Sequence, residues 1–203
     1  EYSTKIAMGQ SSVGTWGHGM SLPEHAGGLG GYGAINQAGA GCWLSLILAQ
    51  KCGVDEPVVR EAIERSRRFY AFYVGKGSIP YGDHAPYYFL HDNDGKNGQV
   101  AIAFDLLGDQ EATRFFSRMS TAAHAEREFG HTGNYFSYLW GPLGVARAGD
   151  AALAAHLKEQ RWFYDLARRW GGGFTYQEAA GSSDSYKGWD ATGVFLLTAS
   201  APL

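Results

Sequence analysis

Residues 37–71 read QAGAGCWLSLILAQKCGVDEPVVREAIERSRRFYA, and this stretch decides the fold. Its first half, Gln37 to Lys51, is apolar almost all round, which is typical of a helix buried on every side. The second half, after Asp55, has one apolar and one charged face, so one side of that helix is expected to meet water. Gly53, between the halves, favours the left-handed conformation that ends a helix. The stretch therefore predicts a hairpin of an inner and an outer helix.

The same order recurs twice along the chain. Apolar inner helices are expected from Asn97 to Leu107 and from Asn134 to Ala148. They end at Gly108 and Gly149, and an amphipathic outer helix follows each glycine. The aspartates expected to cap the outer helices are Asp55, Asp109 and Asp150. Three such junctions predict a repeat of helical hairpins.

A fourth apolar segment, Ala191 to Ser200, is expected to be another inner helix, and no outer partner follows it. Inner helices that are apolar all round need neighbours on both sides, which favours an all-α fold of repeated helical hairpins forming an α/α toroid or an incomplete toroid. We expect one such domain over residues 1–203, in which residues 1–35 are a glycine-rich N-terminal loop segment. The seven expected helices leave the ring incomplete, so another chain or domain is a candidate for completing it.

The composition excludes several classes of protein. Glycine supplies 29 of the 203 residues, but 11 Phe, 12 Tyr and 6 Trp are too many large apolar side chains for a disordered chain. A net charge of −3 without a basic stripe argues against a nucleic-acid partner, and no apolar run is long enough to cross a membrane. Cys42 and Cys52 are expected about 15 Å apart along one helix, which is too far for a disulfide.

Four loop-to-helix segments resemble a known group of folds. They are GGYGAIN (residues 30–36), NDGKNG (93–98), GHTGNYFSYLWGPLG (130–144) and YKGWDATG (186–193). Together with the hairpins and Gly-Asp turns, they look like the α/α toroids of terpenoid cyclases, prenyltransferase β-subunits and related uncharacterised bacterial domains. The DxDD acid motif of the cyclases, an intact QxxxGxW repeat and a matching zinc set are absent from the sequence. The resemblance therefore implies an architecture and no terpene or prenyl chemistry.

Topology indicates where a site would lie. Successive inner helices run in the same direction, so their N-termini are expected to meet at one mouth. The residues expected there are Asn36, Asn97, Asn134 and Asp190. The partial positive charges of several helix N-termini favour an anionic ligand such as a carboxylate or sulfate. The alternative for Asn97, Asn134 and Asp190 is plain N-capping.

His131, Asn134 and Tyr135 are the first candidate catalytic set. They can supply a base, a donor that neutralises a uronate carboxylate, and a proton donor to the leaving oxygen. These residue types resemble those of α/α-toroid polysaccharide lyases that work by β-elimination. The alternative is that Tyr135 packs in the core and His131 is a hydrogen-bonding loop residue.

Asp92 and Asp94 are the second candidate catalytic set, because with Asp190 they can act as acid and base in glycoside hydrolysis. The alternative is that these aspartates form turns and caps. Other polar and aromatic residues of the mouth are expected to bind the substrate, or alternatively to fill the space between hairpins. The expected substrate-binding residues are Tyr32, Asn36, His84, His91, Asn97, Tyr186, Trp189 and Asp190.

No cofactor and no metal ion is predicted. Residues 91–95, HDNDG, lack EF-hand ligands at positions 90 and 101, which leaves an irregular calcium or zinc site as the alternative. Residues 28–33 match GxGxxG, but no strand precedes them, which argues against dinucleotide binding.

These patterns favour a carbohydrate-active enzyme, of the polysaccharide lyase or glycoside hydrolase type, with its site at the mouth formed by the inner-helix N-termini. The expected ligand is a small molecule or a polysaccharide, and an anionic one suits the helix dipoles. The alternative is a non-catalytic helical domain of a larger protein that binds a ligand or partner. That alternative predicts an exposed apolar flank near residues 191–203.

Overall fold

The computed structural model describes residues 1–21, 27–30, 33–82, 85–86, 95–122, 135–177 and 188–201. These residues form eight α-helices, and extended backbone pairs within them only at two isolated bridges. The fold is therefore all-α, as predicted. The helices are α1 (Tyr2–Met8), α2 (Asn36–Lys51), α3 (Pro57–Ala71), α4 (Lys96–Leu106), α5 (Gln110–Ala122), α6 (Tyr135–Ala146), α7 (Asp150–Ala167) and α8 (Thr192–Ser200).

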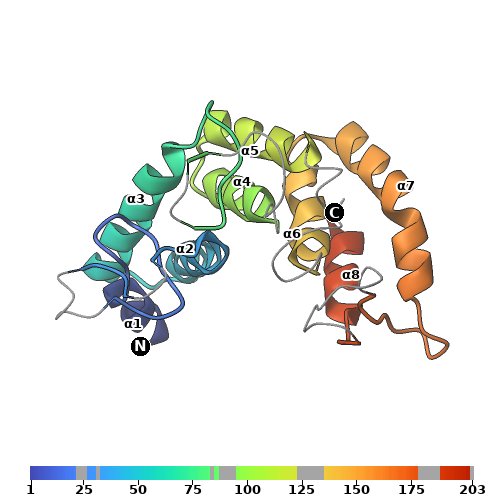
Figure 1. Ribbon diagram of the computed structural model, residues 1–203, viewed down its shortest axis with the longest axis horizontal. Coiled ribbons are helices and arrows are strands. Elements are labelled where there is room, and N and C mark those ends of the chain that lie inside the picture. Colours follow the sequence, from blue (N-terminus) through green and yellow to red (C-terminus); the bar gives the residue numbers. More distant parts are fainter. Residues whose placement is uncertain are drawn as a thin grey trace.

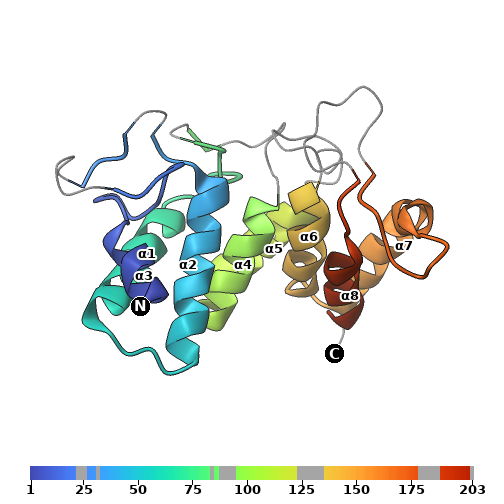
Figure 2. The same cartoon turned by 90° about the horizontal axis from the view of Figure 1, so that it is seen from below.

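The helices form two rows (Figure 1). Helices α2, α4, α6 and α8 lie along the inner side of a curved row, and α3, α5 and α7 lie along its outer side. Each inner helix packs against the next inner helix, and α2, α4 and α6 each pack against the outer helix that follows in sequence. The short helix α1 packs on α2 and α3 and lies within the segment that the sequence predicts as loop. In Figure 2, α2 and α8 run in the same direction, from the upper to the lower end. In the part of the chain that the structure describes, no helix is long and apolar enough to cross a lipid bilayer.

The three expected turn glycines all have a positive φ. Their φ angles are +95° at Gly53, +79° at Gly108 and +105° at Gly149, a region that other residues rarely occupy. Capping by aspartate is confirmed at Asp109, whose Oδ1 accepts a hydrogen bond from the Ala112 N–H at 3.2 Å. The hairpin turns are therefore decided locally.

The caps predicted at Asp55 and Asp150 are wrong. Helix α3 begins at Pro57 with residue 56 as its N-cap, so Asp55 lies one position too early and pairs with Arg60 instead. Asp150 is the first residue of α7 itself, where a carboxylate interacts favourably with the helix dipole without capping a free N–H.

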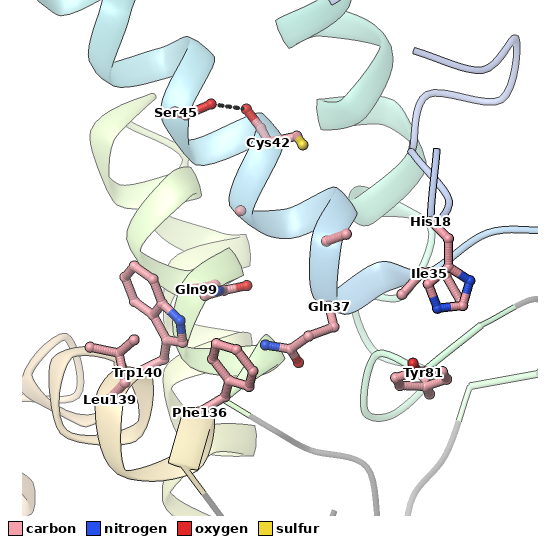
Figure 3. Close-up of a pocket in the computed structure, with 12 residues that line it drawn as sticks. His18, Ile35, Gln37, Cys42, Ser45, Tyr81, Gln99, Phe136, Leu139 and Trp140 are labelled. Atoms are coloured by element: carbon pink, nitrogen blue, oxygen red, sulfur yellow. Dashed lines mark hydrogen bonds between the residues drawn. The ribbon is translucent and has the colours of Figure 1, made fainter. Parts of the chain in front are cut away.

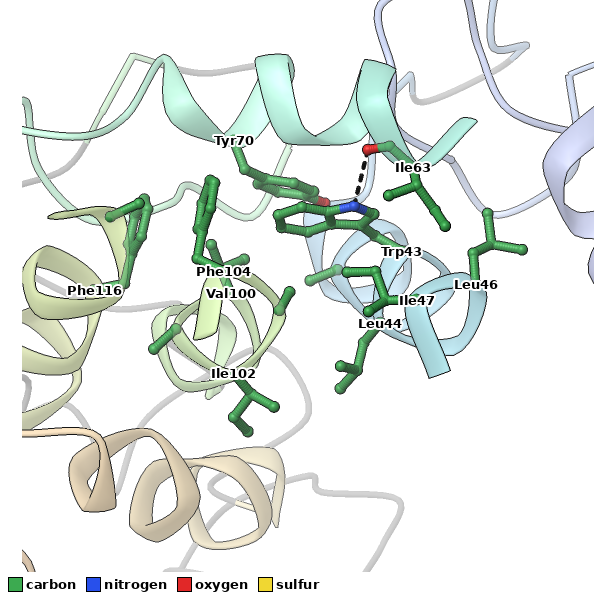
Figure 4. Packing of buried hydrophobic residues seen from close by; sticks show 14 of the residues in the cluster. Trp43, Leu44, Leu46, Ile47, Ile63, Tyr70, Val100, Ile102, Phe104 and Phe116 are labelled. Atoms are coloured by element: carbon green, nitrogen blue, oxygen red, sulfur yellow. Dashed lines mark hydrogen bonds between the residues drawn. The ribbon is translucent and has the colours of Figure 1, made fainter. Parts of the chain in front are cut away.

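Aromatic side chains join the hairpins in the core (Figure 4). Trp43 of α2 is fully buried, stacks on Tyr70 of α3 with ring centroids 5.1 Å apart, and meets Phe104 of α4 edge-on at 5.1 Å. Its indole Nε1 donates a hydrogen bond to the Ile63 carbonyl at 3.1 Å. Phe104 then stacks on Phe116 of α5. One continuous ring cluster therefore connects the first two hairpins.

Two glycines let α4 and α6 approach each other closely. A Cβ at Gly98 would overlap the backbone of Trp140, and a Cβ at Gly144 would overlap the backbone of Gly98. Backbone-to-backbone contact therefore replaces side-chain packing at this crossing. It brings the first turns of α4 beside α6, where the candidate site lies.

Burial on every side holds for α4 but not for α2, in which Leu48 is 47% exposed, or for α8. All residues from Lys96 to Phe104 are buried. In α8 the buried residues are Phe195 and Thr198, whereas Leu196 and Leu197 are exposed. The predicted complete burial of this last inner helix is therefore wrong for the described chain, because its apolar far side has no covering helix there.

Candidate functional site

A cavity of about 660 Å³ lies between α2, α4 and α6 on the side where these helices begin. Its size is within the range of small-molecule sites. Figure 3 shows how side chains from the three helices converge on it. The described lining consists of His18, Ile35, Gln37, Ala38, Gly41, Cys42, Ser45, Tyr81, Gln99, Phe136, Leu139 and Trp140.

Three of these side chains carry buried polar atoms that need a partner. Within the described residues, no hydrogen bond is made by either polar atom of the Gln37 amide, by Oε1 of Gln99 or by Nε1 of Trp140. Gln99 is only 3% exposed. A buried polar atom without a partner costs about 1–3 kcal/mol. Gln37, Gln99 and Trp140 all line this one cavity (Figure 3), so one ligand can contact all three.

The local sequence explains why these amides are buried. Gln37 lies in the first turn of α2 and Gln99 in the first turn of α4, and both helices are apolar along most of their length. Such helices are held on the inner side of the row, where polar side chains such as those of Gln37 and Gln99 face the cavity. The close α4–α6 crossing at Gly98 then sets Trp140 near Gln99.

Three aromatic residues complete the wall. Tyr81 comes from the segment before α4, whereas Phe136 and Trp140 lie one turn apart on α6. Ring faces beside amide groups suit a ligand that has both apolar faces and hydroxyl groups, because the rings contact the former and the amides hydrogen-bond the latter.

The described wall of the cavity is nearly without charge. Its ionisable side chains are His18, Cys42 and Tyr81. Burial raises the pKa of the Cys42 thiol, which therefore stays protonated at neutral pH. Lys96 is fully buried nearby, with Nζ 5.9 Å from the Tyr81 ring centroid, but it does not line the cavity. This wall therefore suits a neutral ligand better than the anionic one that the helix dipoles suggest.

Asn36 and Asn97, two predicted substrate-binding residues, are used by the protein itself. Both are completely buried. The Asn36 amide donates to the carbonyls of residues 80 and 82 at 3.0 and 3.3 Å. The Asn97 amide donates to the Ser78 hydroxyl at 3.1 Å. Neither residue is an N-cap, and together they brace the segment that carries Tyr81.

Tyr135, Trp189 and Asp190 lie together between α6 and α8. The Tyr135 ring is 6.0 Å from the Trp189 ring and 5.3 Å from the ring of the buried Tyr176. Asp190 Oδ1 accepts a hydrogen bond from the Thr192 N–H at 2.9 Å, at the start of α8. Hydrogen bonding with the Thr192 side chain and backbone holds the pKa of Asp190 below its usual range. Asp190 thus serves the end of a helix, while Tyr135 takes part in aromatic packing.

The other predicted site residues lie outside the described part of the chain. They are the catalytic candidates His131, Asn134, Asp92 and Asp94 and the binding candidates Tyr32, His84, His91 and Tyr186. Their roles stay predictions.

The sequence did not predict most of the residues that line the cavity, because the candidate residues were chosen from the loops. The usable signal was a glutamine in the first turn of an otherwise apolar helix, seen at Gln37 and Gln99. Within the described residues, no three His, Cys, Asp or Glu side chains lie close enough to hold a metal ion. Cys42 and Cys52 are free thiols, as expected.

These features define an all-helical domain of repeated hairpins with a cavity at the inner-helix N-termini. The whole chain, residues 1–203, matches a family described as a domain of unknown function (DUF6288), and the chain belongs to this family. No curated protein and no solved structure shows significant similarity to it.

Proposed function

We propose that this chain binds a neutral carbohydrate in the cavity between α2, α4 and α6, as the recognition site of a carbohydrate-active protein. The observation that carries this proposal is the set of buried polar atoms without partners on Gln37, Gln99 and Trp140. A saccharide offers hydroxyl groups that both donate and accept, which matches two amides and an indole N–H. Its apolar ring faces match the aromatic wall of the cavity.

Catalysis is part of the proposal. Hydrolysis is the reaction that fits a neutral carbohydrate, and lyase chemistry, which needs a uronate, is the alternative for an anionic ligand. Tyr135 directly precedes Phe136, which lines the cavity, and its proposed partners are His131 and Asn134, or the acids Asp92 and Asp94. Incubation with uronate-containing and neutral polysaccharides would distinguish the chemistries. A rise in the ultraviolet absorbance of unsaturated uronates would support a lyase and contradict the neutral ligand, whereas new reducing ends without that absorbance would support a hydrolase. Saccharide binding without either product would support a non-catalytic binding domain.

The finer architecture is also a proposal. We infer that the two rows of helices are a segment of an α/α toroid. The alternation of inner and outer helices in Figure 1 and the common direction of α2 and α8 in Figure 2 support this inference. The exposed apolar side of α8 is where a further inner and outer helix would continue the rows.

Replacement of the cavity glutamines tests the binding proposal. Gln37→Leu and Gln99→Leu keep a side chain of similar bulk and remove the amide. We expect each to weaken saccharide binding about tenfold, which is the loss of roughly one hydrogen bond. The free energy of unfolding is expected to stay the same or to rise, because a buried unpaired polar atom is removed. Isothermal titration calorimetry and urea unfolding measure the two quantities.

Gln10→Leu is the matched control. The Gln10 amide is also buried, but it donates to the Ala62 carbonyl and the Ser66 hydroxyl, both at 2.8 Å, and accepts from Arg65 at 2.7 Å. Its replacement is therefore expected to lower stability and leave saccharide affinity unchanged in the protein that remains folded. The proposal would be overturned if no neutral saccharide bound the wild-type protein, or if uronates bound more tightly than neutral sugars.

A second candidate function, docking of another chain or domain that continues the ring, is favoured by the surface of α7 and α8. Trp162, Leu166, Leu196 and Leu197 are exposed there. An apolar hollow of about 250 Å³ is lined by residues of α7 and α8, among them Leu157 and Phe195. Sedimentation velocity over a range of concentrations tests for self-association. Assembly that Leu197→Asp abolishes would support docking, and a monomer at every concentration would count against self-association.

A further inference from the structure

Three aromatic rings lead away from the cavity toward the start of α8. Phe136 lines the cavity, and its ring centroid lies 5.4 Å from that of Tyr135. The Tyr135 ring lies 6.0 Å from that of Trp189. Successive rings thus cross from the cavity side of α6 to the α8 side. Trp189, at the far end of this row, is 51% exposed.

Hydrogen bonds hold the backbone on which the exposed Trp189 side chain lies. The carbonyl of Trp189 accepts a hydrogen bond from the Tyr176 N–H at 2.9 Å. The next residue, Asp190, is held by the N–H of Thr192 and forms a bridge with Thr175. An aromatic side chain that is held in place and still half-exposed offers a large contact surface at a low cost in conformational entropy.

Two other exposed tryptophans lack this setting. Trp162 lies on the outer helix α7, and Trp170 is fully exposed in the turn after it. Trp189 differs because its ring contacts Tyr135 at the start of an inner helix, next in sequence to a residue of the cavity. Trp189 is therefore distinguished from Trp162 and Trp170 by its place near the cavity as well as by its exposure.

We propose that Trp189 forms an outer subsite of the carbohydrate site, so that the ligand is an oligosaccharide and not a single sugar. One sugar unit occupies the cavity at Gln37, Gln99 and Trp140, and a later unit of the same chain stacks on the Trp189 indole. This inference rests on the proposed carbohydrate function and extends it from one sugar unit to a chain of several. Stacking on a ring face does not depend on which hydroxyl groups the outer unit carries, so the outer subsite selects for length more than for sugar identity.

A length series of one neutral oligosaccharide, from the monosaccharide to the hexasaccharide, tests the subsite by calorimetry. For the wild-type protein, affinity is expected to rise with chain length. Trp189→Ala is expected to weaken binding of the longer chains about three- to tenfold and to leave monosaccharide affinity unchanged. Trp189→Phe keeps a ring and is expected to restore most of the loss. Trp162→Ala and Trp170→Ala are the matched controls and are expected to bind every chain like the wild type.

Circular dichroism and urea unfolding show whether each variant is folded, and the half-exposed position of residue 189 allows its replacement. Equal affinity of the wild type for all chain lengths, or full affinity of Trp189→Ala for the hexasaccharide, would overturn the outer subsite while leaving the carbohydrate site in the cavity. Absence of binding by any member of the series to the wild-type protein would overturn both. The two failures are therefore distinguishable.

Discussion

Gly144 of α6 lies directly against Gly98 of α4, so closely that a Cβ at position 144 would overlap the Gly98 Cα. This crossing sets the spacing of the two inner helices. Because Gln99 follows Gly98 and Trp140 lies one turn before Gly144, the same crossing sets the shape of the cavity wall.

Gly144→Ala and Gly98→Ala are expected to lower the free energy of unfolding by about 1–3 kcal/mol, since the added methyl group must push the helices apart. Urea unfolding monitored by circular dichroism measures the change. Gly193→Ala in α8 is the control, because no atom lies within 4 Å of its added Cβ. It is expected to be neutral or to stabilise the helix by up to about 1 kcal/mol. A Gly144→Ala protein as stable as the wild type would contradict the close crossing.

Asn36→Ala is expected to destabilise the protein by about 2–4 kcal/mol. The change removes a buried amide and leaves carbonyl groups of residues 80 and 82 without their donor. Thermal unfolding gives the shift. Gln110→Ala, at an exposed position of α5, is the control and is expected to leave stability within about 0.5 kcal/mol of the wild type. A small effect of Asn36→Ala would argue against its bracing role.

The two thiols are expected to differ in reactivity. Cys52 is exposed, whereas Cys42 is partly buried and burial raises the pKa of its thiol, so Cys42 forms less of the reactive thiolate. Alkylation followed by mass spectrometry should modify Cys52 first. Because Cys42 lines the cavity, a bound saccharide should slow its alkylation further and leave the rate at Cys52 unchanged. Equal protection of both thiols, or of neither, would argue against ligand binding in this cavity.

Acid is expected to loosen the start of α8. Hydrogen bonding with Thr192, assisted by Arg169, lowers the pKa of Asp190 in the folded state. A lowered folded pKa means that ionised Asp190 stabilises the folded state above the unfolded value of about 3.9, and that this stabilisation is lost as the pH falls through the lower folded value. Hydrogen exchange at the Thr192 amide, corrected for its intrinsic pH dependence, should show less protection below about pH 4. In Asp190→Asn this loss of protection should be much smaller, and an unchanged pH profile would contradict the assignment.

The hairpins were predictable from the sequence because their causes are local. The apolar runs before Gly53, Gly108 and Gly149 and the amphipathic runs after them correspond to the inner and outer helices observed. The caps were less predictable. Asp109 caps its helix, whereas Asp55 lies one residue too early to cap α3. Residue propensities do not locate the start of a helix to within one residue.

The candidate site was predicted only in outline. The N-terminal parts of α2, α4 and α6, but not that of α8, line a cavity, and its side chains include Gln37, Gln99 and Trp140, which lie within the helices. Asn36 and Asn97 were predicted to bind the ligand, but they hydrogen-bond to backbone and side-chain groups elsewhere in the chain. Sequence spacing does not reveal such partners.

The order of apolar and amphipathic segments is enough to specify an all-α chain of hairpins, since a 3.6-residue period and a left-handed glycine act over a few residues. Which polar atoms lose their partners depends instead on how helices from distant parts of the chain cross. The contact of Gly98 with Gly144 and the bracing of residues 78–82 by two buried asparagines create the cavity and its unpaired amides. Those contacts join residues that are far apart in the sequence, so they exist only once the helices have packed.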